Sequence, residues 1–337
     1  MSQKPILQIN DLTVSFQSGK DFLPAVEGVS FELNEGEILG IVGESGSGKS
    51  VTSLAIMGLI PAPPGKVEKG EILFEGKNLT KFTERDWRKI RGNQISMIFQ
   101  EPMTSLNPLF TIGNQLMEAI RLHTDLSKEE MKLRSLELLK LVGIPRAEGI
   151  LKEYPHQLSG GMRQRVMIAM AMACNPRVLI ADEPTTALDV TIQAQILALM
   201  QELNQKTNTS IILITHDLGV VAEICQRVVV MYAGQIVEQG DVRTILKDPH
   251  HPYTKGLLKS VPDLRVKKDR LYSIPGTVPA PGTVKNGCRF AARCQEVFGK
   301  CHTEAPELYN SEKAGHEVRC FLHTLKEESE RNVGITS

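Results

Sequence analysis

The chain has 337 residues, more than one average domain, and 41% of them are apolar, which is enough for a sizeable core. Its 39 basic and 39 acidic residues cancel, so the composition argues against nonspecific binding to nucleic acid. Apolar runs such as Ser210–Ile214 have the length of a strand and are too short to span a membrane, and the first residues lack the apolar region of a signal peptide. We therefore expect a soluble intracellular chain, which would act at a membrane only through partner proteins.

The first hundred residues predict mostly strands. Apolar runs and alternations indicate strands at 7–16, 29–33, 38–42, 71–74 and 95–99. A helix is expected at about 50–59, directly after a glycine-rich loop. Beyond Gln100 the apolar residues recur every three or four positions, which predicts helices at 112–122, at 128–142 and after Gly160.

Alternation of strands and helices returns from residue 178. Strands are expected at 178–181, 210–214 and 227–231, helices at 191–205 and 218–224, and a hairpin turn at Gly234. The pattern predicts an α/β fold with a parallel sheet, into which an all-helical segment of about 101–175 is inserted.

Beyond residue 250 the composition becomes rich in loops. His250–Leu258 predicts a short helix, and Pro275, Pro279 and Pro281 predict extended segments. The polar residues from Lys326 onward are expected to fray. We therefore predict a domain of residues 1–250, a C-terminal extension of residues 251–330 that contains four cysteines, and a flexible tail of residues 331–337.

A glycine-rich loop follows the strand at 38–42 and has the pattern G-x-x-x-x-G-K-S. Its members are Gly43, Glu44, Ser45, Gly46, Ser47, Gly48, Lys49 and Ser50. The glycines allow the backbone to turn tightly and to point its N–H groups at phosphate oxygens. Lys49 can reach the β- and γ-phosphates, the Ser50 hydroxyl can bind Mg²⁺, and the following helix presents its positive end to the same anion.

Two carboxylates follow the strand at 178–181. Asp182 and Glu183 stand where ligands bind in a doubly wound sheet, at the carboxyl end of a strand. Asp182 is expected to bind Mg²⁺, directly or through water, and Glu183 to orient or deprotonate an attacking water. An acidic pair after a strand can also be a helix cap, but the upstream phosphate loop favours catalysis.

A second anion-binding pattern precedes the helix that starts near residue 160. Ser159, Gly160 and Gly161 place a capping hydroxyl and two small residues at a helix N-terminus. The alternative is an ordinary helix cap. This pattern lies about twenty residues before the strand that ends in Asp182.

With these motifs in order, the chain resembles an ATP-binding-cassette (ABC) ATPase over about residues 5–330. The resemblance implies a P-loop NTPase (RecA-like) core, a β-subdomain and an inserted helical subdomain, followed by a small C-terminal domain with cysteines. It assigns Gln100 to the loop that senses Mg²⁺ and the membrane partner, and His216 to the γ-phosphate. Asp189, after Ala187 and Leu188, matches the loop at the dimer interface. Phe16 fits an adenine-stacking position; Phe22 is a weaker candidate, and a strand aromatic in the core is the alternative.

The family resemblance also implies a mechanism and partners. Two cassettes face each other head to tail, so that ATP on one Lys49-type loop is completed by the Ser159-type signature of the other. Four stretches resemble the D-type ATPase subunit of oligopeptide or dipeptide importers. They are Ser159–Ala169, Gln100–Pro108, Pro249–Thr254 and Cys288–Cys294. That sub-family implies a second, non-identical ABC ATPase, two integral membrane permeases and an extracellular or periplasmic solute-binding protein. The chain is then peripheral on the cytoplasmic side of the cell membrane.

The C-terminal cysteines leave three alternatives open. Cys288, Cys294, Cys301 and Cys320 could hold a [4Fe–4S] cluster, bind zinc, or remain thiols. Their spacing is wider than that of zinc knuckles, and the resemblance implies the cluster, with a structural or redox-sensing role.

The transported solute and the class of protein also leave alternatives. Nickel, glutathione and other small-solute importers share much of the pattern, because the ATPase does not touch the solute. A soluble cassette protein of DNA repair or translation usually has two cassettes or a long coiled-coil insertion, and this chain has neither. A scaffold with an inactive ATP site is disfavoured by the intact Lys49, Asp182, Glu183 and His216.

Overall fold

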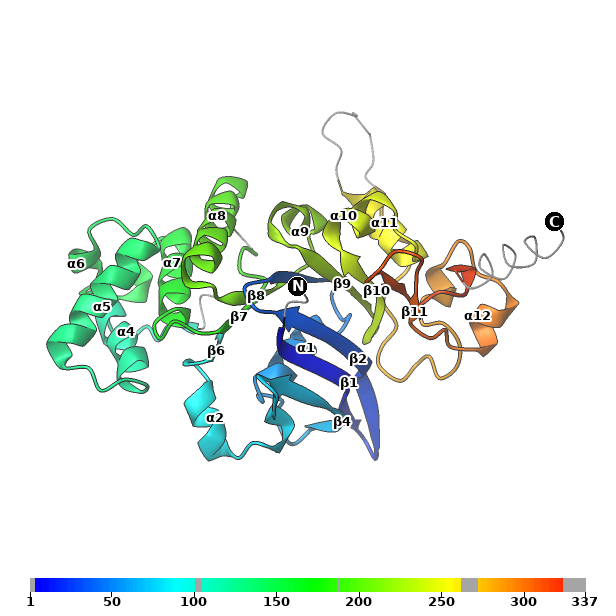
Figure 1. The fold of residues 1–337 in the computed structure, drawn as a ribbon, viewed down its shortest axis with the longest axis horizontal. Coiled ribbons are helices and arrows are strands. Elements are labelled where there is room, and N and C mark those ends of the chain that lie inside the picture. Colours follow the sequence, from blue (N-terminus) through cyan, green and yellow to red (C-terminus); the bar gives the residue numbers. More distant parts are fainter. Residues whose placement is uncertain (1–3, 101–104, 187, 262–271, 324–337) are drawn as a thin grey trace. The chain divides into compact units, whose positions relative to one another are not determined.

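The computed structural model describes residues 4–100, 105–186, 188–261 and 272–323 (Figure 1). The chain forms two compact units. The first contains Leu33–Ile38 and Lys81–Ile214, and the second contains Ile6–Glu32, Leu39–Thr80 and the chain from Thr215 onward. The tail predicted for 331–337 and the frayed end expected from Lys326 lie outside the described residues.

The first unit contains three parallel strands that carry polar residues at their carboxyl ends. They are β6 (Ile95–Ile98), β7 (Val178–Asp182) and β8 (Ser210–Thr215), with Ile95 opposite Val178 and Val178 opposite Ser210. Every residue of β7 and β8 is buried, as expected for strands covered on both faces. The parallel register brings the residues after β6 and β7 to the same edge.

Helices make up most of the rest of the first unit. They are α2 (Glu84–Ile90), α4 (Ile112–Arg121), α5 (Lys128–Leu141), α6 (Ala147–Ile150), α7 (Gly160–Ala171) and α8 (Val190–Thr207). Helices α4, α5 and α7 pack against one another. Their starts agree with the sequence patterns, because Thr111, Ser127 and Ser159 accept hydrogen bonds from backbone N–H groups in the first turn.

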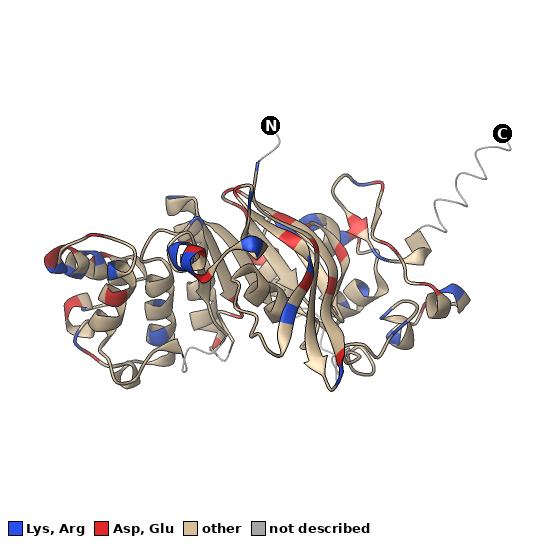
Figure 2. Ribbon diagram, turned by 90° about the horizontal axis from the view of Figure 1, so that it is seen from below, with Lys and Arg blue, Asp and Glu red and all other residues tan. Residues whose placement is uncertain are grey.

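The second unit contains an antiparallel sheet with the order β2-β1-β4-β5. Its strands are β1 (Pro5–Ser18), β2 (Asp21–Asn34), β4 (Gly65–Phe74) and β5 (Lys77–Asn78). Acidic and basic residues are interspersed along it (Figure 2), as in the ion pairs Lys66–Glu68 and Lys69–Asp11 at 3.0 and 3.2 Å. The strand expected at 29–33 is longer than predicted: β2 spans Asp21–Asn34 and is the neighbour of the equally long β1 in the sheet.

A second group of strands in this unit positions the phosphate loop. Its members are β3 (Ile38–Val42), β9 (Arg227–Tyr232), β10 (Gln235–Asp241), β11 (Tyr309–Asn310) and β12 (Glu317–Val318). β3 and β9 are parallel, and β9, β10, β12 and β11 follow as antiparallel neighbours. The helices of the unit are α1 (Lys49–Ile56), α9 (Leu218–Ile224), α10 (Val242–Lys247), α11 (Pro252–Ser260) and α12 (Gly299–Thr303).

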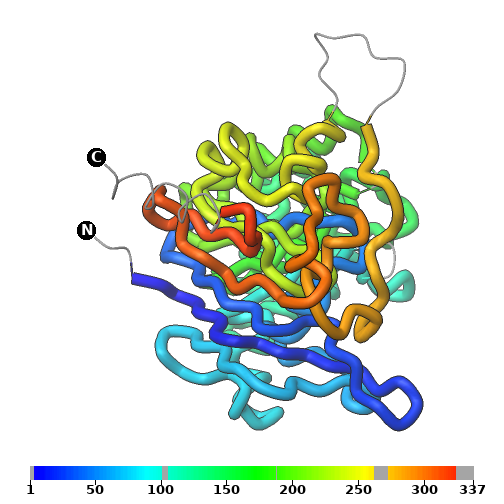
Figure 3. Tube along the Cα trace, turned by 90° about the vertical axis from the view of Figure 1, so that its right-hand side faces the viewer, coloured from blue at the N-terminus to red at the C-terminus, as the bar shows by residue number. Residues whose placement is uncertain are grey.

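The C-terminal segment, residues 272–323, shares the hydrophobic core of the second unit. Figure 3 shows it in orange and red beside the yellow helices α10 and α11. The Phe290 ring is 3% exposed and lies 5.2 and 5.4 Å from the ring centres of Tyr232 and Tyr253. Ile274 and Val278 pack on the same core. Packing on the neighbouring strands therefore orders this loop-rich segment.

No helix within the described ranges has the length and the apolar character that a membrane span requires.

Candidate nucleotide site

The phosphate loop has a backbone that only glycine fits at its first position. Gly43 has φ 156°, and a Cβ there would lie 2.2 Å from the carbonyl oxygen of Met231. Gly48, with φ 102°, is the N-cap of α1. The loop is held from β9 and β10 as well, because the N–H of Gly234 donates to the carbonyl of Ser47 at 2.9 Å. The predicted strand–loop–helix arrangement is present.

The Lys49 ammonium lies over this loop. The residue is buried, and its Nζ donates to the carbonyls of Gly43 at 2.7 Å and of Glu44 at 3.1 Å. Ser50 is half-buried in the first turn of α1. An ammonium held at the N-terminal end of a helix is a suitable partner for phosphate oxygens.

The two carboxylates lie at the end of β7 in the first unit. Asp182 is 4% exposed. Glu183 has φ 48°, the left-handed region that non-glycine residues rarely adopt, and its N–H donates to the carbonyl of Ile214 at 2.9 Å. Backbone of this kind is typical of functional sites, where surrounding contacts hold it in place.

Gln100 and Glu183 meet in the structure. Glu183 Oε2 accepts a hydrogen bond from Gln100 Nε2 at 3.1 Å and another from the Thr186 hydroxyl at 2.8 Å. The Thr186 contact was missed by sequence reasoning; a hydroxyl three residues after the carboxylate was the available signal. These two hydrogen bonds fix the orientation of the Glu183 carboxylate, which remains partly exposed to solvent.

The signature residues and Asp189 begin two neighbouring helices. Ser159 caps α7, accepting from the Met162 N–H at 3.3 Å, and Asp189 caps α8, accepting from the Ile192 N–H at 2.9 Å. The side chain of Ile192 lies over Gly161, where an added Cβ would be 3.1 Å away. An added Cβ at Gly160 would meet no atom within 4 Å. Ala187, and residues 101–104 of the Gln100–Pro108 stretch, lie outside the described residues.

The positions of His216, Phe16 and Phe22 in the structure do not test the roles predicted for them. His216 is exposed directly after β8. Phe16 is half-buried and packs over Gly65, whereas Phe22 is 41% exposed with the Lys66 ammonium 4.0 Å from its ring centre. The phosphate loop belongs to the second unit and Gln100, Asp182 and Glu183 belong to the first. Their meeting in one site stays a prediction.

The cysteines of the C-terminal segment line a small cavity. All six cysteines of the chain are thiols. Burial raises the pKa of Cys288 and Cys294, and raises that of Cys320 to about 12, so these side chains are neutral near pH 7. The cavity they line with Cys301 has a volume of about 20 Å³, room for about one water molecule. Within the described residues, no group of three or more His, Cys, Asp or Glu is arranged to hold a metal ion.

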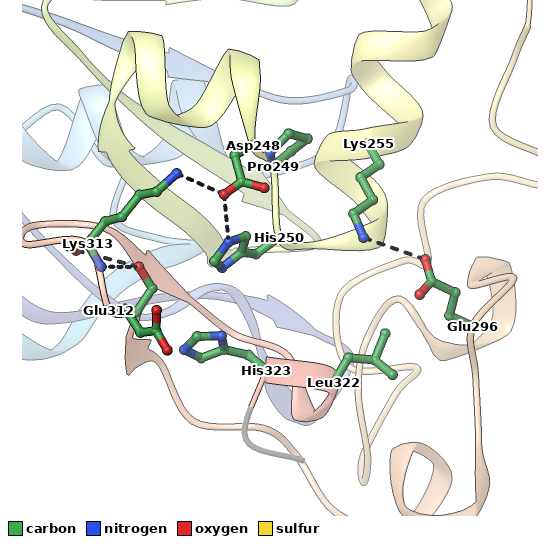
Figure 4. Close-up of a pocket in the computed structure, with 10 residues that line it drawn as sticks. Asp248, Pro249, His250, Lys255, Glu296, Glu312, Lys313, Leu322 and His323 are labelled. Carbon is green, nitrogen blue, oxygen red and sulfur yellow. Dashed lines mark hydrogen bonds and ion pairs between the residues drawn. The ribbon is translucent and has the colours of Figure 1, made fainter. Parts of the chain in front are cut away.

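A polar pocket of about 410 Å³ lies beside the start of α11 (Figure 4). Both of its lysines already face acids: Lys313 Nζ lies 2.8 Å from Asp248, and Lys255 Nζ lies 3.9 Å from Glu296. His250 also contacts Asp248, at 3.4 Å. These ion pairs connect the C-terminal segment to α10 and α11, so the charged groups that line the pocket already stabilise the packing of that segment.

Next to this pocket, the imidazole of His251 is buried in its neutral form. Its side chain is 1% exposed, its Nδ1 accepts from the Tyr253 N–H at 3.0 Å, and desolvation lowers its pKa to about 4. The folded state therefore binds this proton only near pH 4, whereas an unfolded histidine binds it near pH 6.5. The buried neutral His251 therefore contributes its full stabilisation of the folded state above pH 6.5, and this stabilisation is lost as the pH falls towards 4.

We expect His251→Asn to remove this pH dependence. Asparagine can still cap α11, but it has no proton to bind. Between pH 6.5 and 4, the free energy of unfolding should fall more steeply in the wild type than in the variant, by up to about 1.4 kcal/mol per pH unit. Urea unfolding of the full chain at several pH values measures this difference, and parallel curves would contradict the assignment.

The chain is similar to known transport proteins over nearly its whole length. A family model described as ABC transporter matches residues 26–186, and one described as the C-terminal region of oligopeptide/dipeptide transporters matches residues 237–301. The chain is 57% identical over 318 residues to the oligopeptide transport ATP-binding protein AppD of Bacillus subtilis, covering 94% of this chain and 97% of AppD. It is 50% identical over 315 residues to the dipeptide transport ATP-binding protein DppD of Escherichia coli, covering 94% and 96%.

Solved structures agree with this result. The chain matches the ATP-binding cassette MJ0796, in a post-hydrolysis dimeric state bound to ADP and Pi, with a TM-score of 0.63 and 30% identity. The match covers 70% of this chain and 99% of that one. It confirms the α/β nucleotide-binding fold predicted from the sequence.

Two sequence predictions are wrong. The descriptions of the matched families and relatives name transport and ATP binding and mention no cluster, and in the described part of the chain Cys288, Cys294, Cys301 and Cys320 are not arranged to hold a metal ion. The predicted need for a metal failed because Phe290 packs the segment onto the core. The predicted heterodimer is also unsupported: the descriptions of the matched relatives name no second ATP-binding subunit, and MJ0796 is described as dimeric.

Proposed function

The chain belongs to the ABC transporter family of ATPases, and on that premise we propose that it hydrolyses ATP to drive the import of oligopeptides or dipeptides. The observation that carries the peptide assignment is similarity at both ends of the chain. The cassette matches one family model, the segment 237–301 matches the C-terminal region of oligopeptide/dipeptide transporters, and relatives such as AppD align over nearly the whole length.

ATP binding is assigned to the phosphate loop. The loop N–H groups and the Lys49 ammonium neutralise the β- and γ-phosphates, Phe16 stacks on adenine, and His216 contacts the γ-phosphate. The oxygen donors of Ser50, Gln100 and Asp182 suit Mg²⁺, which prefers hard oxygen ligands and supplies further charge neutralisation when bound.

Hydrolysis is assigned to Glu183. It accepts a proton from water as the water oxygen bonds to the γ-phosphorus, and the bond from that phosphorus to the ADP oxygen breaks. The hydrogen bonds from Gln100 and Thr186 hold Glu183 in position for this transfer. Positioning and charge neutralisation supply most of the catalysis in such reactions.

The proposed assembly follows from the ends of α7 and α8. Two cassettes bind head to tail, and the exposed Ser159 and Gly160 of one contact the ATP held by the other. The chain lies on the cytoplasmic side of the membrane against permeases that receive solute from a binding protein. Residues 1–250 form the cassette, with a helical subdomain at about 101–175, and residues 251–330 form the extension.

Ser159→Arg tests the head-to-tail arrangement. A long cation at the start of α7 would block the partner's γ-phosphate, so ATP hydrolysis should fall by roughly 10²-fold, similar to the loss of a transition-state donor. ATP binding at Lys49 should remain. Ser127→Arg is the control, because Ser127 also caps a helix of this unit, and it should lower stability by about 1 kcal/mol without stopping hydrolysis.

The function itself is tested by uptake. The wild-type chain, expressed in a Bacillus subtilis strain that lacks AppD, should restore uptake of a labelled oligopeptide, and the Glu183→Gln chain should not. Restored nickel or glutathione uptake without peptide uptake would overturn the solute assignment. ATP hydrolysis without association with any permease would favour a soluble role instead.

A further inference from the structure

One side chain of the phosphate loop is held by the C-terminal segment. Both oxygens of Glu44 accept hydrogen bonds from the Arg293 guanidinium: Nη1 lies 2.7 Å from Oε2, and Nη2 lies 3.0 Å from Oε1. The Arg293 side chain is 5% exposed and that of Glu44 is 32% exposed. Bidentate pairs of this kind combine charge neutralisation with a fixed orientation.

The Arg293 guanidinium uses all five of its N–H groups. Besides the two bonds to Glu44, Nε donates to the Pro275 carbonyl at 2.8 Å, Nη2 to the Ile274 carbonyl at 3.2 Å and Nη1 to the Tyr232 hydroxyl at 3.3 Å. Its hydrogen bond to Glu44 is the main cause that raises the pKa of Arg293. The cation is therefore built into the C-terminal segment and aimed at the loop.

The backbone of Glu44 is held from both sides. Its N–H donates to the hydroxyl of Tyr253, a fully buried residue of α11, at 2.9 Å. Its carbonyl accepts from Lys49 Nζ at 3.1 Å. A single residue thus connects Arg293 and Tyr253 to the lysine that binds phosphate.

Charge gives this connection a consequence for nucleotide binding. Glu44 is a carboxylate inside the loop proposed to bind a triphosphate, and like charges held close together repel. Arg293 cancels that charge and holds the carboxylate in one direction. We propose that Arg293 is a positioning residue of the ATP site, which makes ATP affinity depend on the docking of residues 272–323 against the phosphate loop. The proposal rests on the ATP site described above.

Arg293→Gln is the direct test. Binding of Mg²⁺ and the non-hydrolysable analogue AMP-PNP to the full chain, measured by calorimetry, should weaken about tenfold, as expected when a charged hydrogen-bonded pair is broken. In ATPase assays KM should rise more than kcat falls. Arg293→Lys keeps the charge without the bidentate fork, so it should lie between the wild type and Arg293→Gln.

A second variant separates this role from a purely structural one. Glu44→Gln in the Arg293→Gln background removes the exposed negative charge and should restore affinity to within about threefold of the wild type. The control is Arg319→Gln: Arg319 also lies in the C-terminal segment and is half-buried, but it donates to the carbonyls of Ile236 and Pro306. It should lower thermal stability and leave the AMP-PNP affinity unchanged.

The outcomes are distinct. If Arg293→Gln melts at a lower temperature but binds AMP-PNP like the wild type, the residue is only structural. If the double variant binds no better than Arg293→Gln, charge neutralisation is wrong. If the wild type itself does not bind AMP-PNP, the proposed ATP site fails, which differs from either result.

Discussion

Glu183→Gln should reduce ATP hydrolysis by two to four orders of magnitude, the usual effect of removing a general base. The amide has the same shape as the carboxylate and can still accept from Gln100 and Thr186. It cannot take a proton from water. ATP binding should therefore persist and the ATP-bound dimer should accumulate, which gel filtration with Mg²⁺ and ATP would detect.

Glu202→Gln is the matched control for this experiment. Glu202 lies on α8 in the same unit and forms an exposed ion pair with Lys206. Its loss should change hydrolysis little, since exposed pairs contribute about 0–1 kcal/mol. Hydrolysis by Glu183→Gln within tenfold of the wild type would show that another group takes the proton.

Gly43→Ala should abolish ATP binding. Its Cβ would lie 2.2 Å from the Met231 carbonyl oxygen and 2.7 Å from Ser47 Oγ. The first of these atoms is backbone of β9 and cannot turn away, so the loop that carries Lys49 must shift. AMP-PNP calorimetry should show no binding, and the melting temperature should fall because the loop and β9 no longer fit together.

Gly46→Ala separates this collision from the effect of a left-handed backbone alone. Gly46 has φ 80°, but an added Cβ would meet no atom within 4 Å. The expected penalty is the intrinsic strain of about 1–2 kcal/mol, with binding retained. Equal loss of binding in both variants would contradict the steric explanation for Gly43.

The features that the sequence predicted well are local. Gly43 to Ser50 adopt the phosphate loop because turn geometry and helix capping depend on neighbouring residues. Ser159 was placed correctly at a helix start for the same reason. The pairing of Gln100 with Glu183 was accessible because both residues follow strands of a parallel sheet. Such features need only the order of the elements and the chemistry of short stretches.

The features that the sequence missed depend on packing between distant residues. The four C-terminal cysteines suggested a metal because their segment has few large apolar side chains. In the structure Phe290 packs against Tyr232 and Tyr253, and Ile274 and Val278 pack on the same core. Arg293 and Glu44 are 249 residues apart. Nothing in either local pattern indicates the pair, because it forms only when the C-terminal segment has docked and its carbonyls have aimed the guanidinium. Sequence alone thus predicted which residues bind phosphate and move a proton. The tertiary structure decided what holds the loop, since a bidentate ion pair needs two side chains brought together within about 3 Å.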